Sequence, residues 1–488
     1  MSIMNMPSYL SHLAMVAALL GLGSGQSLAS LSVASGSATG TASSTATYTQ
    51  SNVPTGTPLP GNYNGMYRPQ VHFSPPIGFM NDNPTTNIAG NQHWGHATSD
   101  DLYTWTNQPI AIFPGGPTEG VFSGSAVIDP NNTSGFFPNQ TNGVVAIYTI
   151  NVPENQTQHI AYSYDNGISF IKYEGNPVIV PGGTNPTQFR DPKVIWYEPT
   201  QNWIMVVAYP VDFKVGIFSS PDLKSWKAES NFTHYGLTGL QYECPNMVEI
   251  PVQDPAEGAP SSIVMTVPRG HYIKNLTRFG PSLISYPYNI MSIVESELAS
   301  NSSLGNGTVL IDYSTVESGA LYFEANITGL TNGDSLDGSL NFTFSSSVSG
   351  EAISGGTFIS SGDVWLDRGR TNGFQSPFFN DKFSATGLYN EADGAWRLSG
   401  IVDRSIIEIF LNGGELSATS VFFPQQALDT MILRVTGLNS TATASVGVWA
   451  LKAAWLGEAN VNGTVYGNVT EGVNSMKKRD MPGAMPLL

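Results

Sequence analysis

The chain has 488 residues but only one cysteine and few charged side chains. A single cysteine, Cys244, excludes an intramolecular disulfide framework and a cysteine-rich zinc site. Charged residues make up 12% of the chain, with 20 basic against 37 acidic side chains and a net charge of −17. Because nucleic-acid phosphates recruit an excess of Lys and Arg, this balance excludes nucleic acid as a partner. Apolar residues reach 41%, which is enough for a core and excludes general disorder.

Long apolar runs are also missing, apart from a short one near the N-terminus. Residues 10–22 are too short a run to span a bilayer, and small residues follow around Ala29. Residues 1–29 are therefore typical of a secretory signal peptide, although the segment before the run has no Lys or Arg. An N-terminal membrane anchor is the alternative. No other segment is apolar enough to cross a membrane, so we expect no stable membrane association.

Glycosylation signals support secretion, outside the cell or at the cell wall. Thirteen asparagines begin an Asn-x-Ser/Thr triplet: Asn131, Asn132, Asn139, Asn155, Asn231, Asn275, Asn301, Asn306, Asn326, Asn341, Asn439, Asn462 and Asn468. Residues 30–61 are almost entirely Ser, Thr, Ala, Gly and Pro, and cannot bury enough surface to offset the entropy of ordering. We expect a linker there and a poorly patterned tail at 458–488.

A repeated pattern predicts a β-propeller over residues 62–270. The segments HATSDDLYTW (96–105), IAYSYDNGISF (160–170) and GIFSSPDLKSW (216–226) each read as a strand that ends in Ser, followed by Asp, a turn and an aromatic residue. Their serines, at 99, 163 and 220, are spaced by 64 and 57 residues. A period of this size in a chain of short β-rich runs is typical of four-stranded propeller blades.

The pattern changes near residue 300. Alternating apolar and polar runs, such as 320–327 and 396–411, predict a C-terminal β-sandwich over 300–457, with a linker at 271–299. The fold class is therefore all-β, a propeller followed by a sandwich. Assembly of two copies through the sandwich stays open.

Three carboxylates stand out by their surroundings. Asp82 follows two prolines and a glycine, Asp191 lies between Arg190 and a proline, and Glu243 precedes Cys244, each near the start of a strand-like run. The inner strands of a propeller converge on an axial pocket, so these groups are expected to meet there. Arg190 can hold a neighbouring carboxylate ionised, and aromatic and sulfur neighbours favour the protonated form of Glu243. One ionised and one protonated carboxyl group is the arrangement that glycoside hydrolysis needs, whereas a turn-capping or salt-bridged carboxylate is the alternative for each residue alone.

These motifs resemble those of glycoside hydrolase family 32, which comprises invertases, inulinases and fructosyltransferases. HFSPPIGFMND (72–82), FSGSA (122–126), FRDP (189–192) and ECP (243–245) occur in the family's order, and WGHATSDDLYTW (94–105) and VDRSIIEIF (402–410) are similar to its blade and sandwich motifs. The resemblance covers about residues 62–457. It implies a five-bladed propeller, a small-molecule saccharide as partner, no cofactor and no metal.

The resemblance also assigns roles by position. Asp82 would be the nucleophile, Glu243 the acid/base, and Asp191 the residue that holds sugar hydroxyls and stabilises the transition state. The residues that would line the fructose pocket are Asn81, Trp94, Phe122, Ser123 and Arg190. The implied activity is retaining cleavage of terminal β-fructofuranosyl bonds, in sucrose or fructans, with fructosyl transfer to another sugar as the alternative.

The sequence departs from the family's pattern in two places. Asp82 is followed directly by Asn83-Pro84, where the family continues Asp-Pro-Asn-Gly and runs through two strands to a substrate-contacting Gln. A Trp- and Tyr-rich stretch that completes blade four and builds most of blade five is missing as well. The blade period fits between three and four times into residues 66–270, so we expect an incomplete ring. A catalytically inactive sugar-binding glycoprotein is therefore a further alternative.

Other reactive side chains have structural interpretations. His93 and His96 lack a third clustered ligand, so a metal site is not expected. Cys244 has no histidine nearby in sequence and is interpreted as a packing neighbour of Glu243. For Asp403 and Glu408 in the sandwich motif we expect structural or interface roles, with Arg404 as a candidate partner.

Overall fold

The computed structural model describes residues 19–20, 65–74, 92–99, 101–116, 118–182, 185–233, 242–250, 266–276, 280–330, 338–374, 376, 379–387 and 394–454. Within these ranges the chain forms β-strands and three short 3-10 helices, η2 (Glu198–Thr200), η3 (Pro210–Asp212) and η4 (Ile290–Ile293). The all-β prediction is confirmed. A search of the same ranges finds no helix long and apolar enough to cross a membrane.

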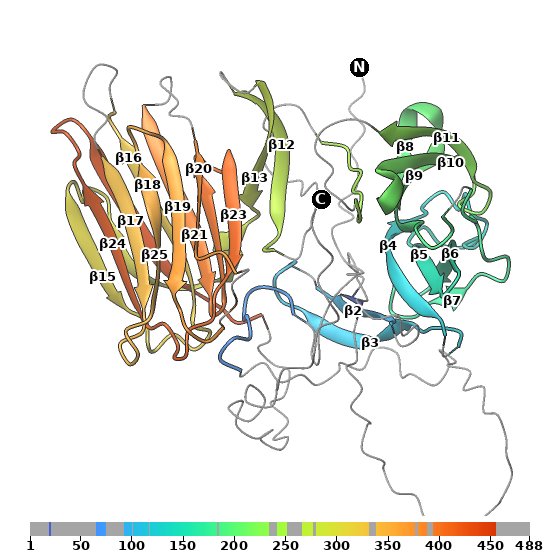
Figure 1. The fold of residues 1–488 in the computed structure, drawn as a ribbon, viewed down its shortest axis with the longest axis horizontal. Coiled ribbons are helices and arrows are strands. Elements are labelled where there is room, and N and C mark those ends of the chain that lie inside the picture. The colour runs from blue at the N-terminus through green and yellow to red at the C-terminus, as the bar shows by residue number, and fades with distance from the viewer. Residues whose placement is uncertain are drawn as a thin grey trace, which may run out of the picture.

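The propeller region contains two four-stranded antiparallel sheets (Figure 1). The first contains β4 (Gly120–Ile128), β5 (Val144–Val152), β6 (Asn155–Ser163) and β7 (Ile171–Lys172), and the second contains β8 (Arg190–Tyr197), β9 (Asn202–Tyr209), β10 (Lys214–Ser220) and β11 (Lys227–Thr233). In both sheets each strand pairs with the next one along the chain. Phe137, Ile147, Phe189 and Trp203 belong to one buried cluster that packs the two sheets together.

The repeated Ser–Asp pattern forms the same turn each time. Ser163 Oγ lies 2.7 Å from Asp165 Oδ1, and the same Asp oxygen accepts the N–H of Ser169 at 2.8 Å. Equivalent bonds join Ser99 to Asp101 and Ser220 to Asp222. The side chains thus replace backbone acceptors in the turn after each strand. The turn follows β6 and β10, each of which is the third strand of its sheet. The pattern therefore identifies the connection between the third and fourth strands of a blade.

The first sheet of the propeller region has a different composition. Its strands are β2 (Trp94–Thr98) and β3 (Thr106–Ile112), with the two-residue strand β1 (Leu19–Leu20) paired to the other edge of β2. Ser99 follows β2, so β2 and β3 match the third and fourth strands of a blade. Among the described residues, strands that match the first and second are absent from this sheet. The loss of two strands after Asp82 stays a prediction, because residues 75–91 lie outside the described residues.

The segment 271–299 is not the expected linker. It contains most of the hairpin formed by β12 (Arg269–Leu276) and β13 (Gly280–Pro287), followed by η4 and the start of β14 (Val294–Asn301). The prediction failed because these strands carry Gly, Pro, Lys and Asn, which hid the alternation. Figure 1 shows the hairpin beside the sandwich, and Ser285 donates its backbone N–H to the carbonyl of Gly414 at 3.0 Å.

Two six-stranded sheets make the sandwich. One has the order β14-β25-β16-β21-β22-β23 and the other β15-β24-β17-β18-β19-β20. The remaining strands are β15 (Gly307–Asp312), β16 (Ala320–Thr328), β17 (Ser339–Ser345), β18 (Ala352–Phe358), β19 (Asp363–Arg370), β20 (Lys382–Thr386), β21 (Ala395–Asp403), β22 (Ile406–Leu411), β23 (Leu416–Val421), β24 (Thr430–Thr436) and β25 (Thr443–Leu451). Strict alternation of buried residues, as in β17, places one face of each strand in a shared core that includes Phe323, Phe342 and Trp396.

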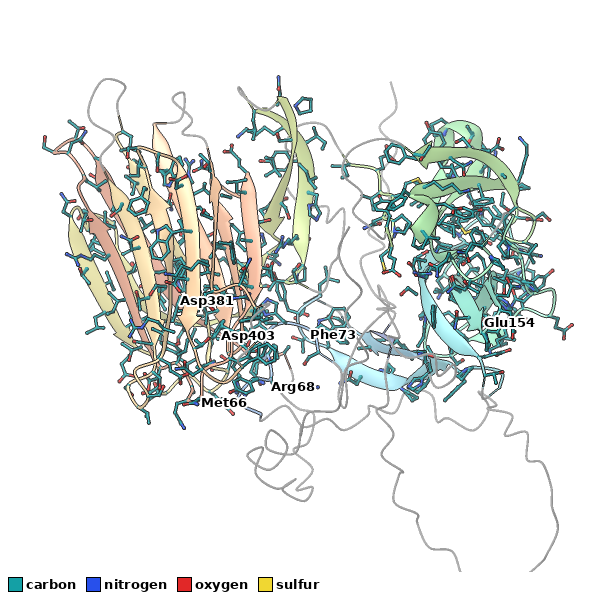
Figure 2. All side chains as sticks on the ribbon, in the orientation of Figure 1. Met66, Arg68, Phe73, Glu154, Asp381 and Asp403 are labelled. Carbon is teal, nitrogen blue, oxygen red and sulfur yellow. The ribbon has the colours of Figure 1, made fainter. Side chains whose placement is uncertain are left out.

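A buried charged cluster joins the segment 65–74 to the sandwich. His72 Nδ1 lies 2.9 Å from Asp403 Oδ2, and His72 Nε2 lies 2.9 Å from Glu408 Oε1. Arg269 Nη2 lies 2.6 Å from the other oxygen of Glu408, and the backbone N–H groups of residues 70–72 all donate to Asp403. Figure 2 shows Asp403 on the side of the sandwich that faces Arg68 and Phe73.

The cluster brings together two cations and two anions. Burial acts to lower the pKa of His72, but hydrogen bonds and charges from Asp403 and Glu408 outweigh it and raise that pKa to about 9. The interface role expected for the two carboxylates thus agrees with these contacts. Arg404, the expected partner, donates to the carbonyls of Ser318 and Gly65, and its charge interacts with that of Asp403.

Candidate active site

Of the eight candidate site residues, six lie within the described ranges. Asn81 and Asp82, the expected nucleophile, fall in 75–91 and lie outside the described residues. The remaining candidates come from β2, from the start of β4, from the start of β8 and from the segment 242–250.

Asp191 is held in an unusual backbone conformation at the start of β8. Its φ is +64°, in the left-handed region that side chains other than glycine rarely adopt, and the pairing of β8 with β9 shifts register between Arg190 and Lys193. The backbone N–H of Asp191 donates to Thr149 Oγ1 at 3.2 Å, and its side chain is only 5% exposed. Such strain persists where surrounding contacts enforce it, as they commonly do at functional sites.

Glu243 is brought to the same place by Arg190. The Nε and Nη2 atoms of Arg190 lie 2.8 and 2.5 Å from Oε1 of Glu243. Cys244, with a φ of +50°, donates its backbone N–H to Oδ2 of Asp191 at 3.0 Å. The FRDP and ECP motifs are thus in direct contact, although 53 residues separate them in sequence.

The pairing of Arg190 differs from the sequence-based expectation. Its guanidinium contacts the carboxylate of Glu243, whereas its Nε lies 4.0 Å from Oδ2 of Asp191. Cys244 is exposed and donates its backbone N–H to Asp191, and the expected packing of its sulfur beside Glu243 stays a prediction. Glu243 keeps a quarter of its side chain exposed.

Three polar residues behind the FRDP motif were not singled out from the sequence. Gln156 Oε1 accepts Nη1 of Arg190 at 3.3 Å and the N–H of Phe189 at 2.8 Å. Gln158 donates to the carbonyl of Phe189 and accepts the hydroxyl of Thr149, which in turn supports Asp191. The signal that the sequence offered was the alternation in β6, where Gln156 and Gln158 occupy buried positions. That pattern shows that the two side chains are buried but does not identify the groups that they bind.

Trp94 and Phe122 lie close together on the other side of β5. Trp94 Nε1 donates to the carbonyl of Phe122 at 2.9 Å, and Phe122 pairs with Thr149 across the sheet. Both side chains are nearly inaccessible, with exposures of 0% and 4%. Ser123, at a bulge between Phe122 and Gly124, is half-buried. Contact between these three and a sugar stays a prediction.

Among the described residues, no group of three or more His, Cys, Asp or Glu side chains is placed to hold a metal ion. His96 is buried, and burial lowers its pKa to about 4. His93 stacks on Phe113 with ring centroids 6.4 Å apart.

The fold is a set of propeller-type sheets followed by a C-terminal sandwich, and the described contacts bring Arg190, Asp191 and Glu243 together at the start of β8. Two family models match the chain, the N-terminal domain of glycosyl hydrolases family 32 over residues 77–280 and its C-terminal domain over residues 322–450. The extracellular exo-inulinase of Meyerozyma guilliermondii is 32% identical over 466 residues, which cover 73% of this chain and 90% of that protein. The chain belongs to glycosyl hydrolases family 32, as its motifs indicated.

Other relatives match over a smaller part. Invertase 2 of Saccharomyces cerevisiae is 50% identical over 216 residues, which cover 39% of this chain, so the chain matches 40% of the length of that invertase. Among solved structures, the β-fructofuranosidase from Schwanniomyces occidentalis complexed with fructosyl-erythritol is similar with a TM-score of 0.67 and 29% identity, covering 79% of this chain and 98% of that one. The exo-inulinase from Aspergillus awamori shares the fold, with a TM-score of 0.67 at 23% identity.

Proposed function

We propose that the chain is a secreted glycoside hydrolase that cleaves terminal β-fructofuranosyl bonds, in sucrose or related fructans, by a retaining double displacement. The observation that carries this proposal is the direct contact between the FRDP and ECP motifs, in which Arg190 binds Glu243 and Asp191 accepts the N–H of Cys244. Family membership and the similarity to invertase and inulinase sequences support the same chemistry.

In the proposed reaction, Asp82 attacks the anomeric carbon while Glu243 gives its proton to the leaving glycosidic oxygen. Water then attacks the anomeric carbon of the fructosyl-enzyme. Glu243 takes a proton from the water, and the bond between Asp82 and the sugar breaks. Arg190 binds only Oε1 of Glu243 in the contacts above, so Oε2 is the oxygen assigned to carry the transferred proton. Asp191, whose backbone N–H donates to Thr149 and whose Oδ2 accepts the N–H of Cys244, is the residue assigned to hold sugar hydroxyls.

Sucrose cleavage by the full chain tests the proposal, with Asp82→Ala and Glu243→Gln as variants. We expect the chain to release fructose, Asp82→Ala to lose that activity, and Glu243→Gln to fall by about 10²–10⁴-fold. Activity that survives Asp82→Ala would contradict the assigned nucleophile. Analysis of products at high sucrose concentration separates hydrolysis from fructosyl transfer, because only a transferase makes longer oligosaccharides as its main product.

One observation favours a second candidate, a sugar-binding glycoprotein without catalysis. The sheet that follows Asp82 contains, within the described ranges, two strands that match the outer half of a blade and the two-residue strand β1 on the other edge of β2. A displacement of about 1 Å at the nucleophile can cost on the order of 100-fold in rate. Fructose binding without any sucrose cleavage, in protein that unfolds cooperatively, would establish this candidate over the hydrolase.

A further inference from the structure

The FRDP motif begins with backbone that its own sheet does not pair regularly. The register of β8 against β9 shifts between Arg190 and Lys193. The two residues between them therefore oppose a single residue of β9, which is the pattern of a β-bulge. One of the two is Pro192, which has no backbone N–H to give to the ladder. The buried N–H and C=O groups around this bulge need partners from outside the sheet.

Side chains of the neighbouring four-stranded sheet supply such partners. Strands β4 and β5 of that sheet lie against β8 (Figure 1). Thr149 Oγ1, on β5, accepts the backbone N–H of Asp191 at 3.2 Å, and Gln158 Nε2, on β6, donates to the carbonyl of Phe189 at 2.8 Å. Thr149 Oγ1 and Gln158 Oε1 are 2.8 Å apart. Both side chains are fully buried, so water does not compete for these bonds.

The two ends of this chain of hydrogen bonds fix the direction of every proton in it. The N–H of Asp191 can only donate, and the carbonyl of Phe189 can only accept. The hydroxyl of Thr149 therefore accepts from Asp191 and gives its own proton to Gln158 Oε1. The amide nitrogen of Gln158 is left to donate to Phe189. A hydroxyl group accepts and donates at one atom, whereas a methyl group of similar size does neither.

These bonds hold the peptide groups on both sides of Arg190. The carbonyl of Phe189 belongs to the peptide before Arg190, and the N–H of Asp191 belongs to the peptide after it. The guanidinium of Arg190 binds Glu243, and Oδ2 of Asp191 accepts the N–H of Cys244. The φ of +64° at Asp191 is a conformation that persists only where neighbouring contacts enforce it. Thr149 and Gln158 provide such contacts.

Ser125, in the FSGSA motif, holds the other side of the bulge in the same way. Its Oγ donates to the carbonyl of Pro192 at 3.0 Å and accepts the N–H of Val194 at 3.1 Å. These two groups belong to the peptides on either side of Lys193. The FSGSA motif is thus joined to the FRDP motif through backbone groups, although the two motifs lie in different sheets.

We propose that Thr149, Gln158 and Ser125 are positioning residues of the candidate active site. Together they form a clamp, the FRDP clamp, that sets the backbone of residues 189–194. The clamp directs the carboxylate of Asp191 and the guanidinium of Arg190 toward the ECP segment. This inference rests on the proposed glycoside hydrolysis, in which Asp191 stabilises the transition state and Arg190 binds the acid/base Glu243.

Thr149→Val tests the clamp, because valine has nearly the shape of threonine but lacks the hydroxyl. We expect kcat for sucrose, measured on folded protein, to fall by about 100-fold, the effect of a displacement of about 1 Å near the reacting atoms. KM should change less, since Asp191 is assigned to the transition state. Thr149→Ser keeps the hydroxyl and should restore most of kcat. A Thr149→Val variant with the kcat of the unmutated chain would overturn the proposal.

Thr357→Val separates positioning from stability. Thr357 is also fully buried, and its Oγ1 accepts Nε1 of Trp396 in the sandwich at 3.1 Å. Both substitutions leave a buried N–H without its acceptor, so both should lower the Tm. Thr357→Val should nevertheless leave kcat and KM of the folded protein unchanged. Equal losses of kcat in the two variants would mean that Thr149 acts through stability alone and would overturn the proposal.

The crystal structure of Thr149→Val gives a readout that does not depend on activity. We expect the φ of Asp191 to leave the left-handed region and its bond with the N–H of Cys244 to be lost. An unchanged φ with that bond intact would overturn the clamp. If the unmutated chain cleaves no sucrose, a changed φ would still support the clamp, and only the proposed hydrolysis would be contradicted.

Ser125→Ala provides a second variant in case Thr149→Val does not fold. Ser125 is half-buried, so the loss of its hydroxyl should be tolerated by the fold. The backbone around Lys193 should shift in the crystal structure of this variant, and kcat should fall. An unchanged backbone at residues 189–194 together with an unchanged kcat would overturn the proposal.

Discussion

His72 and Asp403 are joined by two hydrogen bonds across 331 residues of sequence, one from the ring nitrogen Nδ1 and one from the backbone N–H of His72, both to Oδ2 of Asp403. The ring's other nitrogen contacts Glu408. One imidazole thus connects the HFSPP motif to the sandwich motif VDRSIIEIF. The contact is 0–1% exposed on both sides, so water does not compete for it.

Replacing His72 by leucine should destabilise the chain strongly. The substitution leaves Asp403 and Glu408 buried with only one of the two positive charges that balance them. Breaking a buried ion pair in this way typically costs about 3–5 kcal/mol. Urea unfolding measures the change. Lys227→Ala is the matched control, because it breaks the ion pair to Glu229 with exposures of 76% and 39% and should change the free energy of unfolding little. Equal losses in the two variants would contradict the role given to the cluster.

The same cluster predicts how stability depends on pH. The pKa of His72 is raised from 6.5 to about 9, so its contribution is complete below pH 6.5 and is lost as pH rises through about 9. Asp403 and Glu408 have lowered pKa values because their bonds and charges with His72 outweigh the effect of burial, so their contribution is lost at acid pH. We expect the stability difference between the unmutated chain and His72→Leu to shrink between pH 6.5 and 9, by on the order of 3 kcal/mol. A difference that stays constant over this range would contradict the assignment.

Gln156→Leu should impair catalysis without unfolding the chain. The substitution removes the acceptor of the Phe189 N–H and one acceptor of Arg190. The free energy of unfolding should therefore fall by about 1–3 kcal/mol. Because Arg190 then holds Glu243 less firmly, kcat for sucrose should fall by about 10-fold or more. Gln425→Leu serves as the control, since Gln425 is exposed and bonds through its backbone. Unchanged kcat in Gln156→Leu would show that Arg190 needs no such support.

Asp165→Ala tests the repeated turn. Asp165 accepts bonds from Ser163 and from both the N–H and the hydroxyl of Ser169. Its loss should cost about 0.5–2 kcal/mol, the range found for side-chain caps of backbone N–H groups. Asp222→Ala, at the same place in the next sheet, should give a similar loss in urea unfolding. A large loss at only one of the two positions would mean that the turns are not equivalent.

The parts of this fold that could be predicted depend on short-range patterns. Ser163 and Asp165 are two residues apart, so their turn repeats visibly in the sequence, and the sandwich shows the alternation that burial of one face requires. The hairpin β12–β13 was missed because its alternation is interrupted by polar residues and by Gly and Pro.

The arrangement of the candidate active site could not be predicted from sequence periodicity alone. The contact of Arg190 with Glu243 spans 53 residues, and the family resemblance, not periodicity, placed the two motifs together. Gln156 and His72 could not be assigned from the sequence, because a buried polar residue is defined by its partner and the partner of His72 is more than 330 residues away.

The span of the His72 contacts has a consequence for biosynthesis. Residues 70–72 cannot complete their bonds until residues 403–408 have been synthesised, so the HFSPP segment must wait while most of the chain is made. Contacts of such high sequence separation form late and slowly. During translation the strands made first can therefore be stabilised only by contacts within their own sheets. The contacts that join the two domains can form only near the end of synthesis.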